Sequence, residues 1–338
     1  MTQADSNMAA RDWMSVLSKY RSPRNLRSVV ELGITLTPYL ILWVAACWVL
    51  QYSYLAAFAM SAVNGAFLLR LFIIQHDCGH AAFVSNRTAQ DWIGRVLGVI
   101  TLTPYDVWKR THAIHHGHTG DLDHRGIGDV MTLTVAEYEA RSWLGRLAYR
   151  AYRHPITLFG LAPSYLFLLQ NRIPLGLMRA GARYWISAMA TNAAILVVLL
   201  AIYYFLGLGA LLLVFLPSTI VAASIGMWLF YVQHQFEHTH WDPNEHWDLH
   251  EAALHGSSHY DLPKVLRWLT GNIGIHHVHH LYSRIPFYRL PEVLRDHAEL
   301  VEQSRLTLID SFRCAKLDLW DEGSRRLISF KAARALAT

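Results

Sequence analysis

Residues 185–232 decide the fold class, and they read WISAMATNAAILVVLLAIYYFLGLGALLLVFLPSTIVAASIGMWLFYV. The stretch contains no Asp, Glu, Lys or Arg, and Gly207 divides it into apolar runs of 185–206 and 208–232. A helix needs about 20 consecutive apolar residues to cross the hydrocarbon core of a bilayer. Each run is long enough, so the stretch predicts two membrane-spanning helices joined by a tight turn at Gly207.

Two earlier apolar runs, 34–50 and 54–74, repeat this arrangement with only residues 51–53 between them. Arg70 is the single charged residue in the second run, and its long side chain is expected to reach the interface. The chain is 53% hydrophobic and only 16% charged, whereas about 25% of residues are charged in average soluble domains. We therefore predict an all-α integral membrane protein with four transmembrane helices in two hairpins.

The remaining chain is expected to form the parts outside the membrane. Residues 1–33 are predicted to be a cytosolic N-terminal segment, in which 8–20 forms a short interfacial helix or a leader without structure. The membrane domain is expected to cover 34–294, followed by a cytosolic C-terminal tail at 295–338. The apolar stretches 92–103 and 156–169 are too short to span, so they are expected to lie at the interface, to be re-entrant, or to cap a site.

The distribution of basic residues predicts the orientation. The two short connections, 51–53 and the turn at Gly207, carry no Lys or Arg. The other segments carry many, namely Arg21, Arg24, Arg27, Arg141, Arg146, Arg150, Arg153, Arg172, Arg179 and Arg183. Cytosolic loops carry the excess of Lys and Arg, which places both termini and the central segment in the cytosol. These residues lie beside apolar runs, so the net charge of +5 indicates a membrane surface and no nucleic acid partner.

Histidine is the unusual feature of the composition, with 20 residues that fall mostly in short clusters. Three clusters have helical spacing of three or four residues, which places their side chains on one helix face. Their members are His76, His80, His112, His115, His116, His276, His279 and His280. All three clusters fall on the predicted cytosolic side, so they are expected to form one centre. A looser group, His234 and His238, ends the fourth apolar run and is a candidate to complete the coordination, although both could simply face water.

The number of imidazoles predicts a pair of metal ions. A single zinc ion takes four protein ligands in structural sites and three in catalytic sites, and eight histidines exceed either. Imidazole suits zinc, copper, iron and nickel, so the ligand type alone does not select the metal. Soluble di-iron bundles use Glu together with Glu-x-x-His, a pattern that is absent here. We interpret the clusters as a histidine-rich dinuclear site, with iron as the preferred metal.

The clusters also resemble a known family. His76-Asp-Cys-Gly-His80, His112-x-x-His115-His116 and His276-x-x-His279-His280 are similar to the three histidine boxes of membrane fatty acid desaturases. The resemblance extends over about residues 32–294. The flanking text, such as TPYDVW at 103–108 and IPFYRL at 285–290, is most similar to the acyl-lipid omega-6 / delta-12 branch.

This resemblance implies an activity and its components. The enzyme would use O2 to insert a cis double bond, at the delta-12 or omega-6 position, into a fatty acyl chain of a membrane lipid. Two Fe ions would be held by the eight box histidines, with His234 or His238 as a further ligand and no catalytic side chain beyond the ligands. The fused donor domain of some relatives, with its His-Pro-Gly-Gly signature, is missing, which implies an external electron donor, either ferredoxin or a cytochrome b5-type protein.

The same resemblance implies an integral protein of the bacterial inner membrane with its active site on the cytosolic face. Two alternatives remain open at this point. A di-iron membrane hydroxylase or carotenoid ketolase would use the same boxes and differ only in the fate of the substrate. A metal-binding or transport protein would use the histidines as a relay, although transport residues usually lie inside the spans.

Overall fold

The computed structural model describes residues 9–126 and 128–336, and most of its elements are helices. Three helical stretches are long and apolar enough to cross a membrane: α2 (Asn25–Val49), α3 (Tyr54–Gly79) and the 53 residues of Ala182–His234. The third stretch comprises α9 (Ala182–Ala210), the π-helical turn η4 (Leu211–Phe215) and α10 (Leu216–His234). The four apolar runs of the sequence lie inside these helices.

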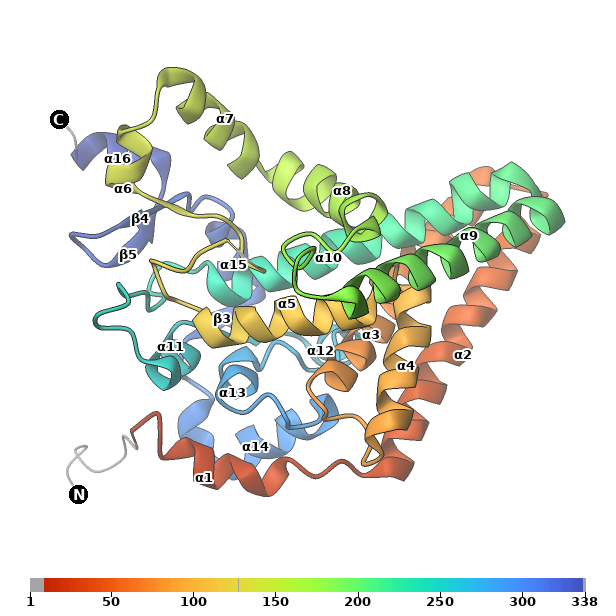
Figure 1. Ribbon diagram of the computed structural model, residues 1–338, viewed down its shortest axis with the longest axis horizontal. Helices are drawn as coiled ribbons and strands as arrows, with labels where there is room; N and C mark the ends of the chain where they lie inside the picture. Colours follow the sequence, from red (N-terminus) through yellow and green to blue (C-terminus); the bar gives the residue numbers. More distant parts are fainter. Residues whose placement is uncertain (1–8, 127, 337–338) are drawn as a thin grey trace.

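Gly207 breaks the third stretch into two arms. Its φ of 81° and ψ of 175° are not helical, and glycine adopts a positive φ without the steric penalty of a Cβ atom. Figure 1 shows the chain reversing there, so that α9 and α10 run antiparallel; α10 packs against α3, whereas α9 packs against α4 and α5. The predicted turn at this position is therefore present.

Arg70 lies in a buried ion pair, so the expectation that it reaches the interface was wrong. Its side chain in α3 is only 1% exposed, and its Nη2 lies 2.6 Å from Oε2 of Glu31 in α2. The guanidinium carbon also lies 4.2 Å from the centre of the Trp268 ring, which supplies a cation–π contact. The hydropathy of α3 does not indicate that the carboxylate of Glu31 in α2 lies against Arg70.

Two amphipathic helices follow α3. α4 (Arg87–Ile100) begins at Asn86, whose side chain accepts a hydrogen bond from the amide of Ala89 at 2.9 Å, and α5 (Tyr105–His118) follows after a short turn. Tyr105 at the start of α5 donates to Asp91 of α4 at 2.7 Å and to the carbonyl of Cys78 in α3 at 2.8 Å. These bonds hold α4 and α5 against the end of α3.

The central segment and the end of the chain form a layer of short elements. The helices are α6 (Val135–Glu139), α7 (Trp143–Arg153), η2 (Thr157–Leu161), α8 (Ala162–Leu168), η3 (Gln170–Arg172), α11 (Leu249–His255), α12 (Lys264–Leu269), α13 (His276–Leu281), η5 (Phe287–Arg289), α14 (Leu290–Asp296), η6 (Ala298–Leu300), α15 (Leu308–Cys314) and α16 (Phe330–Leu336). The strands are β1 (Leu133–Thr134), β2 (His259–Asp261), β3 (Arg305–Thr307), β4 (Leu319–Asp321) and β5 (Arg326–Ile328). β4 pairs with β1 in parallel and with β5 in antiparallel, and β3 pairs with β2 in parallel. The pairs β3–β2 and β4–β1 thus join the C-terminal part of the chain to earlier parts.

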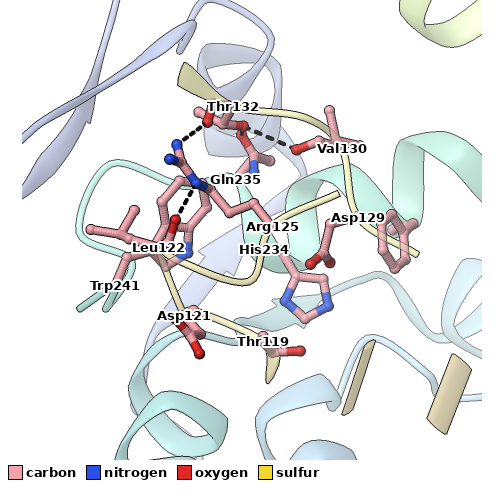
Figure 2. A pocket seen from close by; sticks show the side chains of 12 residues that line it. Thr119, Asp121, Leu122, Arg125, Asp129, Val130, Thr132, His234, Gln235 and Trp241 are labelled. Atoms are coloured by element: carbon pink, nitrogen blue, oxygen red, sulfur yellow. Dashed lines mark hydrogen bonds between the residues drawn. The ribbon is translucent and has the colours of Figure 1, made fainter. Parts of the chain in front are cut away.

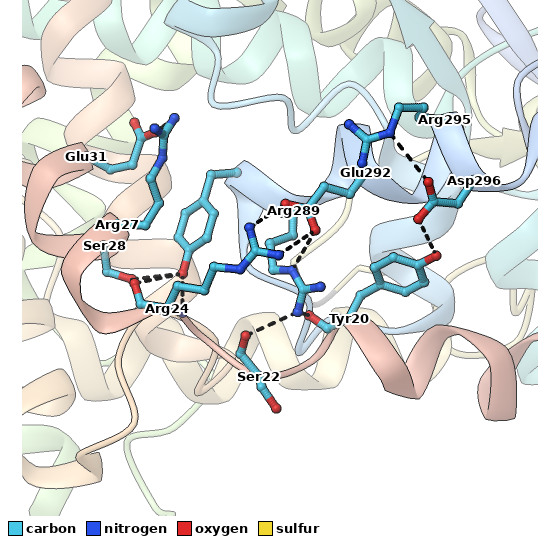
Figure 3. Close-up of polar contacts among 11 residues, drawn as sticks. Tyr20, Ser22, Arg24, Arg27, Ser28, Glu31, Arg289, Glu292, Arg295 and Asp296 are labelled. Carbon is cyan, nitrogen blue, oxygen red and sulfur yellow. Dashed lines mark hydrogen bonds and ion pairs between the residues drawn. The ribbon is translucent and has the colours of Figure 1, made fainter.

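The described part of the N-terminal segment, residues 9–24, forms a strap across this layer. It contains α1 (Trp13–Leu17) and η1 (Ser18–Tyr20), and Trp13 and Leu17 are buried in one apolar cluster with Val278 of α13. Figure 3 shows its polar contacts with α14: Arg24 lies 2.8 Å from Glu292, and Tyr20 donates to Asp296 at 2.8 Å. The helix expected at 8–20 therefore exists from Trp13, and it packs on the helix that carries the third histidine cluster.

Replacing Leu17 with alanine should destabilise this layer. Leu17 is completely buried, and removing a buried leucine side chain costs about 2–5 kcal/mol because a cavity remains. Thermal unfolding of the purified protein in detergent should show a lower midpoint for Leu17→Ala. Ser15→Ala, at an exposed position of the same helix, should change the free energy of unfolding by no more than about 0.5 kcal/mol. Equal effects of the two variants would contradict the buried strap.

Candidate metal centre

Five histidines from three helices form the first group. They are His76, His80, His112, His116 and His279, and one nitrogen of each lies within 4.8 Å of the others. Nε2 of His116 lies 3.1 Å from Nε2 of His112 and 3.2 Å from Nε2 of His279. α3 continues past the apolar run as far as Gly79, which carries His76 and the adjoining His80 to the ends of α5 and α13.

Four histidines form the second group, directly beside the first. They are His115, His234, His276 and His280, again with one nitrogen of each within 4.8 Å of the others. Nε2 of His234, at the end of α10, lies 3.2 Å from Nε2 of His115 and 3.0 Å from Nε2 of His276. The rings of His116 and His280 stack with their centres 4.0 Å apart, so imidazole rings of the two groups are in direct contact.

Helix periodicity divides α5 and α13 between the two groups. On α5, His112 and His116 are four residues apart and face the first group, whereas His115 faces the second. On α13 the division is reversed, with His276 and His280 in the second group and His279 in the first. Residues four apart lie on one stripe and the residue between them is rotated away. Each of these helices therefore serves both groups.

The two groups fit metal ions by three observations. Burial, followed by the neighbouring imidazoles, lowers the pKa of His112, His116 and His279 well below the usual value, so these rings are neutral and can act as ligands. Among the residues that the structure describes, Nε2 of His80 and Nε2 of His280 are buried and have no hydrogen-bond partner. Two nitrogens that each lie about 2.1 Å from one ion, at angles near 90–110°, are separated by about 3.0–3.4 Å. The Nε2–Nε2 separations given above, from 3.0 to 3.2 Å, lie within this range. The donor set is one that zinc, copper, iron and nickel accept.

A carboxylate orients one histidine of the second group. Oδ1 of Asp129 lies 2.6 Å from Nδ1 of His115, whose Nε2 faces His234. Figure 2 shows Asp129 and His234 on the wall of a small pocket of about 30 Å³. Arg125 holds the surrounding loop by donating to the carbonyls of Leu122 and Thr132, both at 2.6 Å. Nothing in the sequence analysis singled out Asp129, because its relation to His115 arises from the path of the loop.

Replacing Asp129 with alanine should weaken metal binding. A histidine ligand usually donates its other N–H to a carboxylate or carbonyl, and losing that partner costs about 10- to 100-fold in metal affinity or activity. Asp129→Asn should lose less, because its amide oxygen still accepts the bond. Metal content after dialysis against a graded chelator measures the effect, and the exposed Asp123 provides the control Asp123→Ala. Full metal retention in Asp129→Ala would contradict the orienting role.

Three neighbouring histidines are not brought into either group. His238, a candidate ligand from the sequence, is exposed, so of the pair at the end of the fourth run only His234 joins the cluster. His240 pairs with Asp242 at 2.8 Å. Nε2 of His277 lies 3.0 Å from the carbonyl oxygen of Leu300, and burial lowers the pKa of His277 to about 3.

A long apolar cavity reaches both groups. Its volume is about 470 Å³, and its wall includes His76 and His112 of the first group and His276 of the second. The remaining wall comes mainly from apolar residues of α3, α5, α8 and α10. Cavities for small ligands occupy about 300–1,000 Å³. The arrangement can therefore hold an apolar molecule against the imidazole groups.

Comparison with known proteins agrees with this geometry. The family described as Fatty acid desaturase matches residues 52–312. A "Fatty acid desaturase" of Bacillus subtilis is 40% identical over 320 residues, which are 94% of this chain and 90% of the relative. A Synechocystis protein named "sn-1 oleoyl-lipid 12-desaturase" is 24% identical over 83% of this chain and 74% of the relative. Another Synechocystis protein, "sn-1 acyl-lipid omega-3 desaturase (ferredoxin)", is 27% identical over 68% and 63%. This chain thus belongs to the fatty acid desaturase family and is an oxidoreductase.

Proposed function

We propose that this chain is a membrane-bound, non-haem di-iron desaturase that uses O2 to insert a cis double bond into a fatty acyl chain of a membrane lipid. The observation that carries the proposal is the apolar cavity of about 470 Å³ whose wall includes histidines of both groups. A fatty acyl chain has no polar group along its length, so an apolar cavity that touches two candidate metal sites suits such a substrate.

Nine histidines are the proposed ligands of two iron ions. His76, His80, His112, His116 and His279 would hold one ion, and His115, His234, His276 and His280 the other. Bound there, the irons would supply the oxidising power that removes hydrogen from an unactivated methylene, which no amino-acid side chain supplies. The family membership supports iron, and the imidazole donors of the two groups are ones that iron accepts.

The side chains of this protein would position the substrate and exclude water. Trp108 lines the cavity and stacks on His112 with the ring centres 4.5 Å apart. Phe230 lines it on the other side, 5.0 Å from the ring of His115. Holding the reacting carbon in a fixed position raises the reaction rate, because its translational and rotational entropy is already lost on binding. The two aromatic rings would thus fix which methylene group lies against the imidazoles.

Four transmembrane helices, α2, α3, α9 and α10, are proposed to anchor the enzyme, with the histidine groups on the cytosolic face of the bacterial inner membrane. The connection at 51–53 and the turn at Gly207 carry no Lys or Arg, and both lie at the end of Figure 1 that is remote from α5 and α13. The distribution of basic residues supports this orientation. The division into 1–33, 34–294 and 295–338 is proposed on the same grounds.

The position of the double bond and the electron donor are the finer parts of the proposal. We place the double bond at delta-12 or omega-6. The sequences that flank the histidine clusters and the name of the Synechocystis 12-desaturase support this position. The electrons would come from ferredoxin or a cytochrome b5-type protein. The name of the Synechocystis omega-3 relative mentions ferredoxin.

Lipid analysis of an expressing host tests the proposal. The host should make only monounsaturated acids, and mass spectrometry should locate the new double bond. Dienoic acids with the second double bond at carbon 12 are expected, and none with the His115→Ala variant. A new double bond elsewhere would overturn the position alone. Hydroxy acids or oxidised carotenoids would overturn desaturation in favour of a hydroxylase or ketolase.

A further inference from the structure

Along η2 and α8, one layer of helix separates the cavity from the outer surface of the protein. Leu158 and Leu166 line the cavity from this segment. Leu161 and Tyr165, on the opposite face, are 62% and 56% exposed. Residues separated by about four positions recur on one helix face, so residues 157–169 have an inner apolar face and an outer apolar face. We call residues 157–169 the lateral wall.

The hydrogen bonds that join the lateral wall to the rest of the protein lie beyond its two ends. Before it, the buried Arg153 donates to the hydroxyl of Tyr231 at 2.9 Å and to the carbonyl of Leu317 at 2.7 Å. After it, Arg172 donates to Asn192 of α9 at 3.0 Å, and Asn192 donates back to the carbonyl of Arg172 at 2.7 Å. These bonds fix the two chain segments that lead into and out of the wall.

Between these anchors the wall meets α10 and α3 through side-chain packing. The ring of Phe159 lies 4.9 Å from Trp228 and 5.2 Å from Tyr231, both in α10. In the described part of the chain, no hydrogen bond or ion pair joins residues 157–169 to α3 or α10. Aromatic pairs and apolar packing hold this boundary, and side chains of this kind can separate in an apolar surrounding without leaving a polar atom unpaired. The seam between the wall and α10 is therefore a boundary of the cavity that can open without breaking a polar contact.

The outer face of the wall continues into a basic amphipathic helix. On α7, Trp143, Leu144 and Leu147 are 67%, 58% and 55% exposed, and Arg141 and Arg146 are exposed beside them. Figure 1 shows α7 leading directly into the helical segment that crosses α10. A helix whose exposed surface carries aromatic and aliphatic residues next to arginines is suited to a bilayer interface, where basic residues attract anionic headgroups.

We propose that the seam between the lateral wall and α10 is a portal through which the acyl chain of a bilayer lipid enters the cavity sideways. This inference rests on the proposed function and names its substrate as a lipid that stays in the cytosolic leaflet during binding. The chain passes from one apolar environment to another without exposure to water. The headgroup stays at the interface beside Arg141 and Arg146. A soluble acyl thioester would instead have to enter from the cytosolic side.

Photolabelling in a bilayer tests the portal without requiring turnover. The purified protein is placed in nanodiscs of phosphatidylglycerol that carries a diazirine in its acyl chain, and labelled peptides are identified after illumination. Labels are expected on the inner residues Leu158 and Leu166 as well as on the outer Tyr165. Phe159 is not among the residues that line the cavity, and Phe159→Ala removes both aromatic contacts across the seam. It should therefore increase the initial rate of inner labelling by at least about two- to tenfold, the effect expected for the loss of even one such contact. Phe205→Ala, an exposed ring on α9, should change nothing.

Two results would overturn the portal. The first is labelling by the lipid confined to the outer face, with an acyl thioester bearing the same diazirine labelling the inner residues. The second is an unchanged rate of inner labelling in Phe159→Ala. Either result would leave desaturation intact if the expressing host still gains double bonds. A host without new double bonds would instead reject the proposed function, whatever the labelling pattern.

Discussion

Replacing His234 with alanine will lower the iron content from about two ions to about one per chain and reduce double-bond formation at least about 100-fold, the upper range for losing even an indirect metal contact. Nε2 of His234 lies within 3.2 Å of Nε2 of His115 and 3.0 Å from Nε2 of His276. Its loss leaves three imidazoles in the second group. The five histidines of the first group keep their positions, because they come from α3, α5 and α13.

His238→Ala is the matched control for this variant. His238 lies four residues further along the chain, carries the same side chain and is exposed. Iron content by elemental analysis and lipid products should both match the unchanged protein. Thermal unfolding should confirm that His234→Ala is folded. If His238→Ala lost iron while His234→Ala kept it, the assignment of the second group would be wrong.

The second large effect concerns the ion pair between α2 and α3. Arg70→Met should lower the free energy of unfolding by up to about 3–5 kcal/mol, because the buried carboxylate of Glu31 then keeps only the half-exposed Arg27 as a partner. Glu31 is 1% exposed, so water cannot solvate its carboxylate once the partner at 2.6 Å is gone. Thermal unfolding in detergent, with the activity of the soluble and folded fraction recorded beside it, measures the loss.

The double variant with Glu31→Leu and Arg70→Met distinguishes the charge from the packing. Replacing both members of a buried ion pair with apolar residues is often neutral or stabilising, so most of the lost stability should return. Arg27 also pairs with Glu31 but is 54% exposed, and Arg27→Met should cost no more than about 1 kcal/mol. A double variant as unstable as Arg70→Met would show that the shape of Arg70 matters more than its charge.

The helical elements that carry the histidines could be predicted from the sequence. The apolar runs at 34–50 and 54–74 lie within α2 and α3, and Gly207 breaks the third apolar stretch where the turn was expected. Spacings of three and four residues predicted that each cluster would share one helix face. This is confirmed for His112 with His116 and for His276 with His280, but it is wrong for His115 and His279, which lie in the other group. These features are local, because they depend on hydropathy and helix periodicity over fewer than 30 residues.

Other features depend on contacts between distant parts of the chain. Arg70 reads as an interfacial residue until α2 brings Glu31 against it. Asp129 acquires a role only because its loop folds back on His115. The strap at 9–24 packs beneath α13, more than 250 residues further along the chain, and short strands such as β3 exist through one neighbouring strand. Such pairings leave no periodic signal in the segments that make them.

The histidine clusters show which features follow from local sequence and which depend on contacts between distant parts of the chain. The sequence alone predicted that clustered imidazoles at helical spacing belong to one centre and exceed the ligands of a single zinc site. Only the tertiary structure decided how they divide, with His115 leaving its own cluster to join His234, His276 and His280. It also decided that His234 belongs to a group whereas His238 faces solvent. The physical reason is that helix spacing sets which residues share a stripe, whereas the packing of α3, α5, α10 and α13 sets which stripes meet.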